Sequence, residues 1–278
     1  MPELPEIQAH AERLSAAFGG TELERFTPLA FTALKTAVPP PEDAYGQALV
    51  SVGRRGKHLL LDFGAVTFVV HLMQGGRLKP DEKQSAKPRF GQARWRFVDG
   101  RALLLTEAGT ERKAGVWVVA GDPDEQVPLH DLGPDADALD LATLRQLLTA
   151  HPMRLHGFLS DQHRLAGLGR LLANEICHRA RLSPFAGTAK LGDDEVARLH
   201  QSITACIDEG LAFERGLTEM SSSKDRPAHV HHRAGEPCPV CGDTVRAVEY
   251  SRYTVAYCPT CQTGGKVLAD NTTSKFLK

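Results

Sequence analysis

The sequence predicts an α+β protein with several domains: an N-terminal antiparallel β-sandwich with an N-terminal helix, a helical segment, and a C-terminal β-hairpin that carries cysteines. Three observations predict this fold class. Residues 48–119 alternate in strand fashion, helical periodicity follows Gly133-Pro134, and four of the six cysteines form two C-x2-C pairs. We therefore expect three segments, which comprise residues 1–133, 134–225 and 226–278.

Composition is that of an ordinary globular protein. Of 278 residues, 42% are hydrophobic and 24% are charged, with 25 Gly and 17 Pro, which excludes disordered, collagenous and disulfide-scaffold classes. No window approaches the roughly 20 apolar residues that span a bilayer, and the N-terminus does not resemble a signal peptide. We expect a soluble cytoplasmic protein with no membrane contact. A net charge of −1 neither predicts nor excludes a polyanionic partner.

The first predicted element is a helix that begins at Pro5 and ends at Gly19-Gly20. Its apolar face is formed by Ile7, Ala11, Leu14 and Phe18. Five strands are then expected at residues 59–63, 66–72, 93–98, 102–106 and 116–119. A helical region then begins at residues 139–148 and continues through residues 167–181 and 193–216. The cysteine pairs flank two short strand-like runs.

The paired cysteines predict a metal site. The pattern is C-x2-C, then 16 residues, then C-x2-C, formed by Cys238, Cys241, Cys258 and Cys261. Four thiolates that converge from two tight turns suit one tetrahedral Zn²⁺ per chain. The alternative, two disulfides, does not suit a cytosolic chain. A closed four-Cys site has no open position for substrate, so the zinc is structural and the chemistry lies elsewhere. Cys177 and Cys206 are expected in the core.

The start of the chain, Met-Pro-Glu-Leu-Pro-Glu, carries the first candidate for chemistry. Removal of Met1 would expose the secondary amine of Pro2 beside Glu3 and Glu6. An α-amino group has a pKa of about 7.7 to 8, so part of it is an unprotonated nucleophile at neutral pH. Such an amine can attack C1′ of a sugar and form an iminium, while Glu3 moves protons. The alternative is an ordinary processed terminus.

Taken together, the order of these motifs resembles the formamidopyrimidine-DNA glycosylase and endonuclease VIII family, and the resemblance covers almost the whole chain. The motifs are Pro-Glu-Leu-Pro-Glu at the start of a helix, a Gly-Arg-Arg-Gly-Lys turn at residues 53–57, the helical midsection and the four-Cys finger. The resemblance implies a helix-two-turn-helix domain in the middle segment and DNA held between the domains. It also implies a monomer in the bacterial cytoplasm that binds damaged double-stranded DNA and carries one structural Zn²⁺.

The resemblance implies roles for individual residues. Pro2 would be the Schiff-base nucleophile, Glu3 would assist base loss and sugar-ring opening, and Glu6 would support the site. Lys57 would contact a phosphate beside the lesion; the alternative is a solvated lysine in a turn. In the hairpin, Arg252 would enter the DNA backbone near the lesion, although it lies one residue earlier than the family pattern.

Residues 161–175 are similar to the family's helix, two turns and helix. Gly169 permits close backbone approach, and the N–H groups of the following helix N-terminus can bind a phosphate. The family has Asn where this chain has Arg170, so a charged phosphate contact replaces a neutral one. Glu175 corresponds to an inward-facing position, for which a surface salt bridge is the alternative.

The sequence departs from the family where DNA must be held open. An enzyme that turns a base out of the duplex fills the gap, because unstacking costs a few kcal/mol. The family commonly uses Met, Arg and Phe. Here Gln74 stands at the Met position, and Arg112, Lys113 and Ala114 match the first three residues of Arg-Arg-Phe-Gly. Arg112 is retained and Ala114 replaces the Phe; Met73 is either a substitute for the Met or a core residue.

Further departures concern the lesion. His156 stands where Lys is frequent, and the stretch before Cys238 is short and lacks the Gly-Gly-Ser/Thr motif of the 8-oxoguanine-specific branch. We therefore expect the Pro2 chemistry to be kept while the lesion changes, to an abasic site or an oxidised pyrimidine.

The resemblance predicts a bifunctional DNA glycosylase and abasic-site lyase of base excision repair, with β-elimination followed by δ-elimination. Two alternatives stay open. A non-catalytic protein that binds damaged DNA or abasic sites would explain the altered gap-filling residues. A zinc-finger transcription factor would need no free Pro2 amine and would read sequence, whereas lesion binding through phosphates is salt dependent and largely sequence independent.

Overall fold

The computed structural model describes residues 1–108, 112–222, 225–250 and 253–268. The predicted DNA contact Arg252 lies outside the described residues. The chain divides into two compact units. The first, here called the β unit, comprises Met1–Leu132 and Leu217–Met220, and the second, the helical unit, comprises Gly133–Gly216 and Ser221–Lys278. The helical segment and the hairpin thus share one unit, and the three-segment division stays a prediction.

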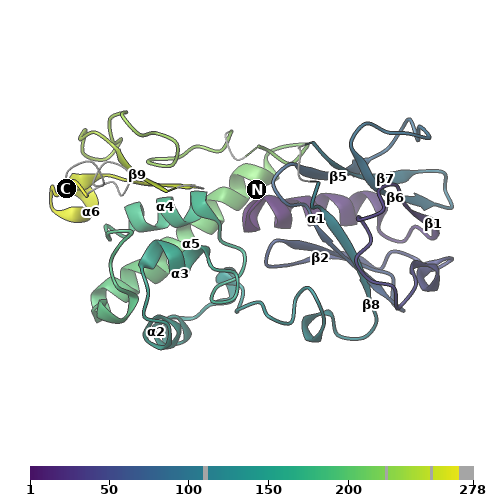
Figure 1. The fold of residues 1–278 in the computed structure, drawn as a ribbon, viewed down its shortest axis with the longest axis horizontal. Coiled ribbons are helices and arrows are strands. Elements are labelled where there is room, and N and C mark those ends of the chain that lie inside the picture. The colour runs from purple at the N-terminus through teal and green to yellow at the C-terminus, as the bar shows by residue number, and fades with distance from the viewer. Residues whose placement is uncertain (109–111, 223–224, 251–252, 269–278) are drawn as a thin grey trace. The chain divides into compact units, whose positions relative to one another are not determined.

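The β unit is the predicted antiparallel β-sandwich with a helix at its start. Its two four-stranded sheets have the strand orders β1-β6-β7-β5 and β2-β3-β4-β8, and α1 packs against β2 (Figure 1). The elements are α1 (Leu4–Phe18), β1 (Leu23–Pro28), β2 (Ser51–Arg55), β3 (His58–Asp62), β4 (Thr67–His71), β5 (Gly76–Pro80), β6 (Gly91–Phe97), β7 (Ala102–Glu107) and β8 (Gly115–Val119), with short 3-10 helices at Pro41–Ala44 and Pro123–Glu125.

Side chains from both sheets meet in one core. The rings of Phe26, Phe68 and Trp95 lie 5.0 to 5.9 Å apart, and the apolar face predicted for α1 is buried against the same core. Burial of each such ring contributes about 1.5–3 kcal/mol, which fixes α1 and the two sheets as one body.

The predicted turn at residues 53–57 is wrong in its extent. Strand pairing continues through Arg55, which faces His58, so only Gly56 and Lys57 turn. Gly56 has φ +55°, a left-handed conformation that glycine adopts without the clash of a Cβ atom. The tighter turn places Lys57 directly between two paired strands.

The helical unit is built around α4. This helix contacts α3, α5 and the hairpin strand β10 (Figure 1). The elements are α2 (Leu141–Ala150), α3 (Leu155–Ser160), α4 (Arg170–Arg179), α5 (Asp193–Arg215), β9 (Arg246–Tyr250), β10 (Tyr253–Tyr257) and α6 (Pro259–Thr263), with 3-10 helices at Ala136–Ala138 and Thr188–Lys190. The predicted hairpin is confirmed, with Val255 facing Val248.

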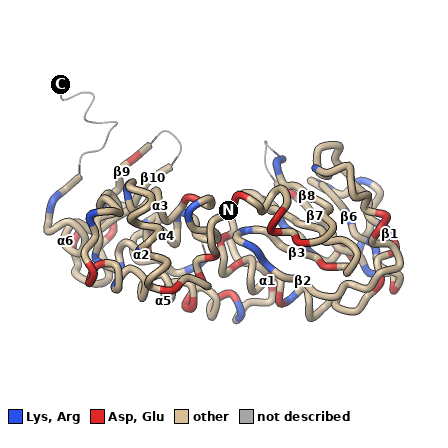
Figure 2. The backbone as a smooth tube through the Cα atoms, turned by 90° about the horizontal axis from the view of Figure 1, so that it is seen from below, with Lys and Arg blue, Asp and Glu red and all other residues tan. Residues whose placement is uncertain are grey.

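Among the described residues, the structure shows neither a segregation of charge within a unit nor a helix that could span a membrane. Figure 2 shows basic and acidic positions interspersed along each unit. Within the described ranges, every helix is too short or too polar to cross a membrane.

Candidate functional site

Residues 2–6 form a buried acidic site at the N-terminus of α1. Pro2 is buried, and Glu3 and Glu6 are only 4% and 1% exposed. The Glu6 carboxylate accepts a hydrogen bond from the backbone N–H of Glu3 at 2.9 Å. Glu3 is the N-cap of α1 and Glu6 lies in its first turn. Negative charge is favoured at a helix N-terminus, so both carboxylates are stabilised there.

The environment of the chain start favours a neutral amine. Burial is the main cause that lowers the pKa of the Met1 amino group; Glu3 and Glu6 oppose the shift, and Lys57 and Arg77 add to it. Lys57 is itself buried in the turn between β2 and β3. The structure therefore brings Glu3, Glu6 and Lys57 within electrostatic reach of the chain start, where an unprotonated amine can act as a nucleophile.

Gln74 lies in the loop between β4 and β5, and Arg112 and Lys113 lie between β7 and β8. Gln74 precedes β5, whose first residue pairs with the last residue of β7, and Arg112 and Lys113 precede β8. All three are exposed. Ala114 is fully buried, and its N–H donates to the Glu107 carboxylate at 2.6 Å. Residue 114 therefore belongs to the core and presents nothing to a partner.

In the helical unit, Arg170 lies at the N-terminus of α4, directly after its N-cap Gly169. The Arg170 guanidinium lies 5.2 Å from the ring centroid of Tyr253 on the hairpin. Tyr253 stacks on His156 at 6.2 Å and on Tyr250 at 4.6 Å. The sequence analysis did not predict this aromatic stack. Arg170 and His156, both of which differ from the residues usual in the family, contact the same ring, that of Tyr253.

Glu175 ties α4 to the segment that leads into the hairpin. Its carboxylate accepts backbone N–H bonds from His229, Val230 and His231 at 2.7, 2.9 and 2.9 Å. Burial alone would raise the pKa of Glu175, but the hydrogen bonds from His229 and these N–H groups lower it to about 2. The inward orientation expected of Glu175 is what the structure has, and the role is structural.

We predict that Glu175→Gln destabilises the helical unit by about 3 kcal/mol at pH 7, since each unit of pKa shift corresponds to about 1.4 kcal/mol. The lowered pKa means that this stability is fully present above about pH 4.5 and is lost as the pH falls toward 2. Urea unfolding of both proteins between pH 7 and pH 3 measures the difference. Glu209→Gln is the matched control, because its pair with Arg179 is exposed and contributes about 1 kcal/mol or less. Equal losses in the two variants would contradict this account.

Four thiols converge as a metal site requires. The sulfur atoms of Cys238, Cys241, Cys258 and Cys261 lie within 4.8 Å of one another. The Cys238–Cys261 and Cys241–Cys258 Sγ distances are 4.0 and 3.4 Å, far beyond a disulfide bond and close to the roughly 3.8 Å that tetrahedral Zn–S bonds of about 2.3 Å require. The four residues therefore fit a structural zinc ion, and His178 Nε2 lies 3.3 Å from Cys238 Sγ, where it can orient that ligand.

The remaining cysteines are core residues, as predicted. Cys177 and Cys206 are buried, and burial raises the pKa of Cys206 to about 11. A thiol that stays protonated at neutral pH is a poor metal ligand and a poor nucleophile.

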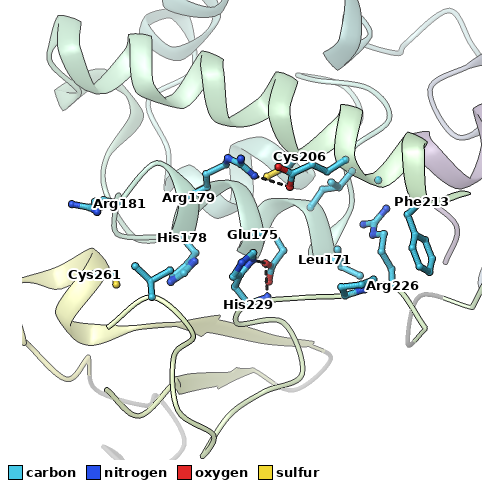
Figure 3. A pocket seen from close by; sticks show the side chains of 15 residues that line it. Leu171, Glu175, His178, Arg179, Arg181, Cys206, Phe213, Arg226, His229 and Cys261 are labelled. Carbon is cyan, nitrogen blue, oxygen red and sulfur yellow. Dashed lines mark hydrogen bonds and ion pairs between the residues drawn. The ribbon is translucent and has the colours of Figure 1, made fainter. Parts of the chain in front are cut away.

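A cavity of about 480 Å³ lies between α4, α5 and the segment before the hairpin (Figure 3). Part of its polar lining is engaged in contacts: Glu175 binds the backbone of residues 229–231, and Arg179 pairs with Glu209 at 2.7 Å. His178 and His229 stack at 5.7 Å along one wall. These contacts hold the hairpin segment on α4.

Comparison with protein families identifies both units. Residues 1–116 match the model of the formamidopyrimidine-DNA glycosylase N-terminal domain, and residues 132–222 match that of the formamidopyrimidine-DNA glycosylase H2TH domain. The formamidopyrimidine-DNA glycosylase of Thiobacillus denitrificans is 31% identical over 273 residues, which cover 94% of this chain and all of that protein. An uncharacterised formamidopyrimidine-DNA glycosylase-like protein of Mycobacterium tuberculosis is 40% identical over 164 residues, 58% of this chain and all of that protein.

Solved structures share the fold over nearly the whole length. MutM (Fpg) from Thermus thermophilus superimposes with a TM-score of 0.80 at 26% identity, over 96% of this chain and all of that one. Lactococcus lactis formamidopyrimidine-DNA glycosylase, bound non-covalently to DNA with an abasic site, gives a TM-score of 0.80 at 19% identity, over 94% of this chain and 99% of that one.

Proposed function

The chain belongs to the formamidopyrimidine-DNA glycosylase family of base excision repair enzymes, and we propose that it excises damaged bases and then cleaves the strand through a covalent bond to Pro2. The observation that carries the covalent step is the chain start. Two buried carboxylates, Glu3 and Glu6, and buried Lys57 lie within electrostatic reach of the chain start, where burial lowers the pKa of the Met1 amine; removal of Met1 would place the Pro2 amine in the same surroundings. One structural Zn²⁺ would be held by the four cysteines, and damaged double-stranded DNA would be bound by a monomer.

The chemistry follows from the nature of the amine. After Met1 is removed, the lone pair of the Pro2 nitrogen attacks C1′ and the bond from C1′ to the base breaks. Glu3 assists loss of the base, takes the proton that the Pro2 nitrogen gives up, and passes it to the ring oxygen as the C1′–O4′ bond breaks; Glu6 holds the backbone of Glu3 in place. The resulting iminium draws electrons from C2′–H, so loss of that proton breaks the C3′–O bond. A second elimination breaks the C5′–O bond, and water then releases the amine.

Positively charged and polar residues would hold the strand. Lys57 binds a phosphate beside the lesion, and Arg170, with the N–H groups that follow Gly169, binds another. Tyr253 orients Arg170 through the contact between guanidinium and ring. Arg252, next to Tyr253 in the sequence, is proposed as a further phosphate contact.

Glu3→Gln is expected to slow base excision about 10²- to 10⁴-fold, the usual contribution of a positioned acid–base group. Borohydride trapping on a preformed abasic site should persist, because the Pro2 amine is unchanged. Single-turnover assays on a lesion-containing duplex and an abasic duplex separate the two steps. Glu12→Gln, further along α1, is the control and should excise at the wild-type rate. Wild-type excision by Glu3→Gln would remove Glu3 from the mechanism.

A second function is favoured by the buried Ala114 and the exposed Gln74: binding of damaged DNA without cleavage. Tight binding to an abasic duplex, with no strand cleavage and no trapped adduct, would support it.

The buried Ala114 and the exposed Gln74 also support a changed lesion preference, toward abasic sites or oxidised pyrimidines. Comparable excision from oxidised-purine and oxidised-pyrimidine duplexes would contradict that preference.

A further inference from the structure

Three chain segments meet at one end of the β1-β6-β7-β5 sheet. β5 starts where β7 ends, with Gly76 facing Glu107, and β6 starts beside them, with Gly91 facing Thr106. The residues that flank these strand ends therefore lie close together. They are Gln74 before β5 and Phe90 before β6; Arg112, which follows β7 in the chain, has its guanidinium near the Phe90 ring. Gln74 and Arg112 are expected to fill the gap in the DNA. Phe90 is an aromatic residue for which the family resemblance implies no role.

The backbone holds Phe90 firmly in this position. Its carbonyl oxygen accepts the N–H of Glu107 at 3.0 Å, which ties the residue to the end of β7. Phe90 has φ +61°, a left-handed conformation that is costly for a bulky side chain. At the next residue, Gly91, a Cβ atom would lie 2.6 Å from Pro88. The turn is thus closely packed, and it keeps the Phe90 ring half-buried at the sheet end.

Two guanidinium groups flank the Phe90 ring. Arg89 lies 4.7 Å and Arg112 lies 5.8 Å from the ring centroid. Arg112 is the residue expected to enter the DNA gap, so the ring contacts the side chain that would approach the bases. Cationic groups attract the phosphate backbone, and an aromatic ring is a surface on which an unpaired base can stack.

Ala114 cannot supply an aromatic contact, because its side chain is fully buried and its N–H is bound to Glu107. We propose that Phe90 instead provides the stacking surface for the base left unpaired opposite the flipped nucleotide, beside Arg112 and Gln74. This inference rests on the proposed function, since it requires a DNA site with one unpaired base.

The test measures binding to a duplex that contains a tetrahydrofuran abasic analogue opposite 2-aminopurine, whose fluorescence reports stacking. Phe90→Ala and Phe90→Leu should bind about 5- to 150-fold more weakly, the range that corresponds to loss of one aromatic–base stack. Phe90→Leu keeps an apolar side chain of similar volume, so it separates stacking from packing. Phe90→Trp should restore binding, and both the wild type and Phe90→Trp should quench the 2-aminopurine.

Phe31→Ala is the matched control. Phe31 is fully exposed on the loop after β1, which is hydrogen bonded to β6 at Gln92, so it is a second phenylalanine near the same sheet end. Its loss should leave affinity and quenching unchanged. Thermal unfolding of each variant accompanies the binding curves.

The inference is overturned if folded Phe90→Leu binds and quenches as the wild type does, or if Phe31→Ala shows the loss instead. If the wild type does not prefer the abasic duplex to an undamaged one, the proposed function fails and the inference falls with it. Wild-type behaviour of Phe90→Leu leaves the lesion-binding function intact, whereas a wild type with no preference for the abasic duplex does not. The failure of the inference and the failure of the proposed function are therefore distinguishable.

Discussion

One extra residue before Pro2 is expected to abolish strand cleavage at abasic sites. The extension turns the Pro2 nitrogen into an amide, which has no available lone pair to attack C1′. Loss of a covalent nucleophile costs on the order of 10⁴-fold or more in rate, far beyond any packing effect at the exposed Met1 position. Cleavage of an abasic duplex under single-turnover conditions measures the change.

Pro2→Gly is the companion variant, because it keeps a terminal amine while it removes the ring. It should retain part of the activity that the extended protein lacks. Both variants should bind the abasic duplex, so that binding without cleavage identifies the defect as chemical. Unchanged cleavage by the extended protein would contradict a role for the N-terminal amine.

Cys238→Ala is expected to lose the zinc ion and unfold the hairpin. The hairpin has only a small core of its own, formed by Val230, Cys238, Val245, Ala256 and Cys258. Structural zinc binding is worth about 10–16 kcal/mol in small domains, so this core cannot replace it. Zinc content should fall from one per chain to near zero, and amide exchange in β9 and β10 should become fast.

Cys206→Ala provides the control for this experiment, since it removes a buried thiol of the same unit outside the cluster. It should keep one zinc per chain and a protected hairpin. The effect of Cys238→Ala should also reach α4, because Asn174 Oδ1 accepts the N–H of Ala256 at 3.3 Å. Retention of zinc and hairpin protection by Cys238→Ala would disprove the structural role of the metal.

Elements with strong local patterns could be predicted from the sequence. The α1 helix is specified by its apolar spacing and by Gly19 at its end, and the metal cluster by two fixed cysteine spacings. β1 was missed because it does not alternate: Glu24 and Arg25 are both exposed, and its pairing register shifts between Leu23 and Arg25. A bulge of this kind breaks the two-residue period that predicts a strand.

The parts of the candidate site that could be predicted are those whose residues lie close together in the sequence. Glu3 and Glu6 lie in one motif at the start of α1, whereas the bonds of Glu175 reach residues 54 to 56 positions away. The contact between Phe90 and Arg112 likewise depends on how the ends of β6 and β7 are paired. No local pattern encodes such contacts, because they follow from tertiary packing.

A bond between the Pro2 nitrogen and DNA can be demonstrated by locating the modified atom in the trapped adduct. The protein is incubated with an abasic duplex and borohydride, the adduct is digested, and the modified residue is identified by tandem mass spectrometry. We expect a sugar remnant on the N-terminal peptide that begins at Pro2, with Met1 absent. A remnant on Lys57 or any other lysine, or no adduct with correctly processed protein, would contradict it.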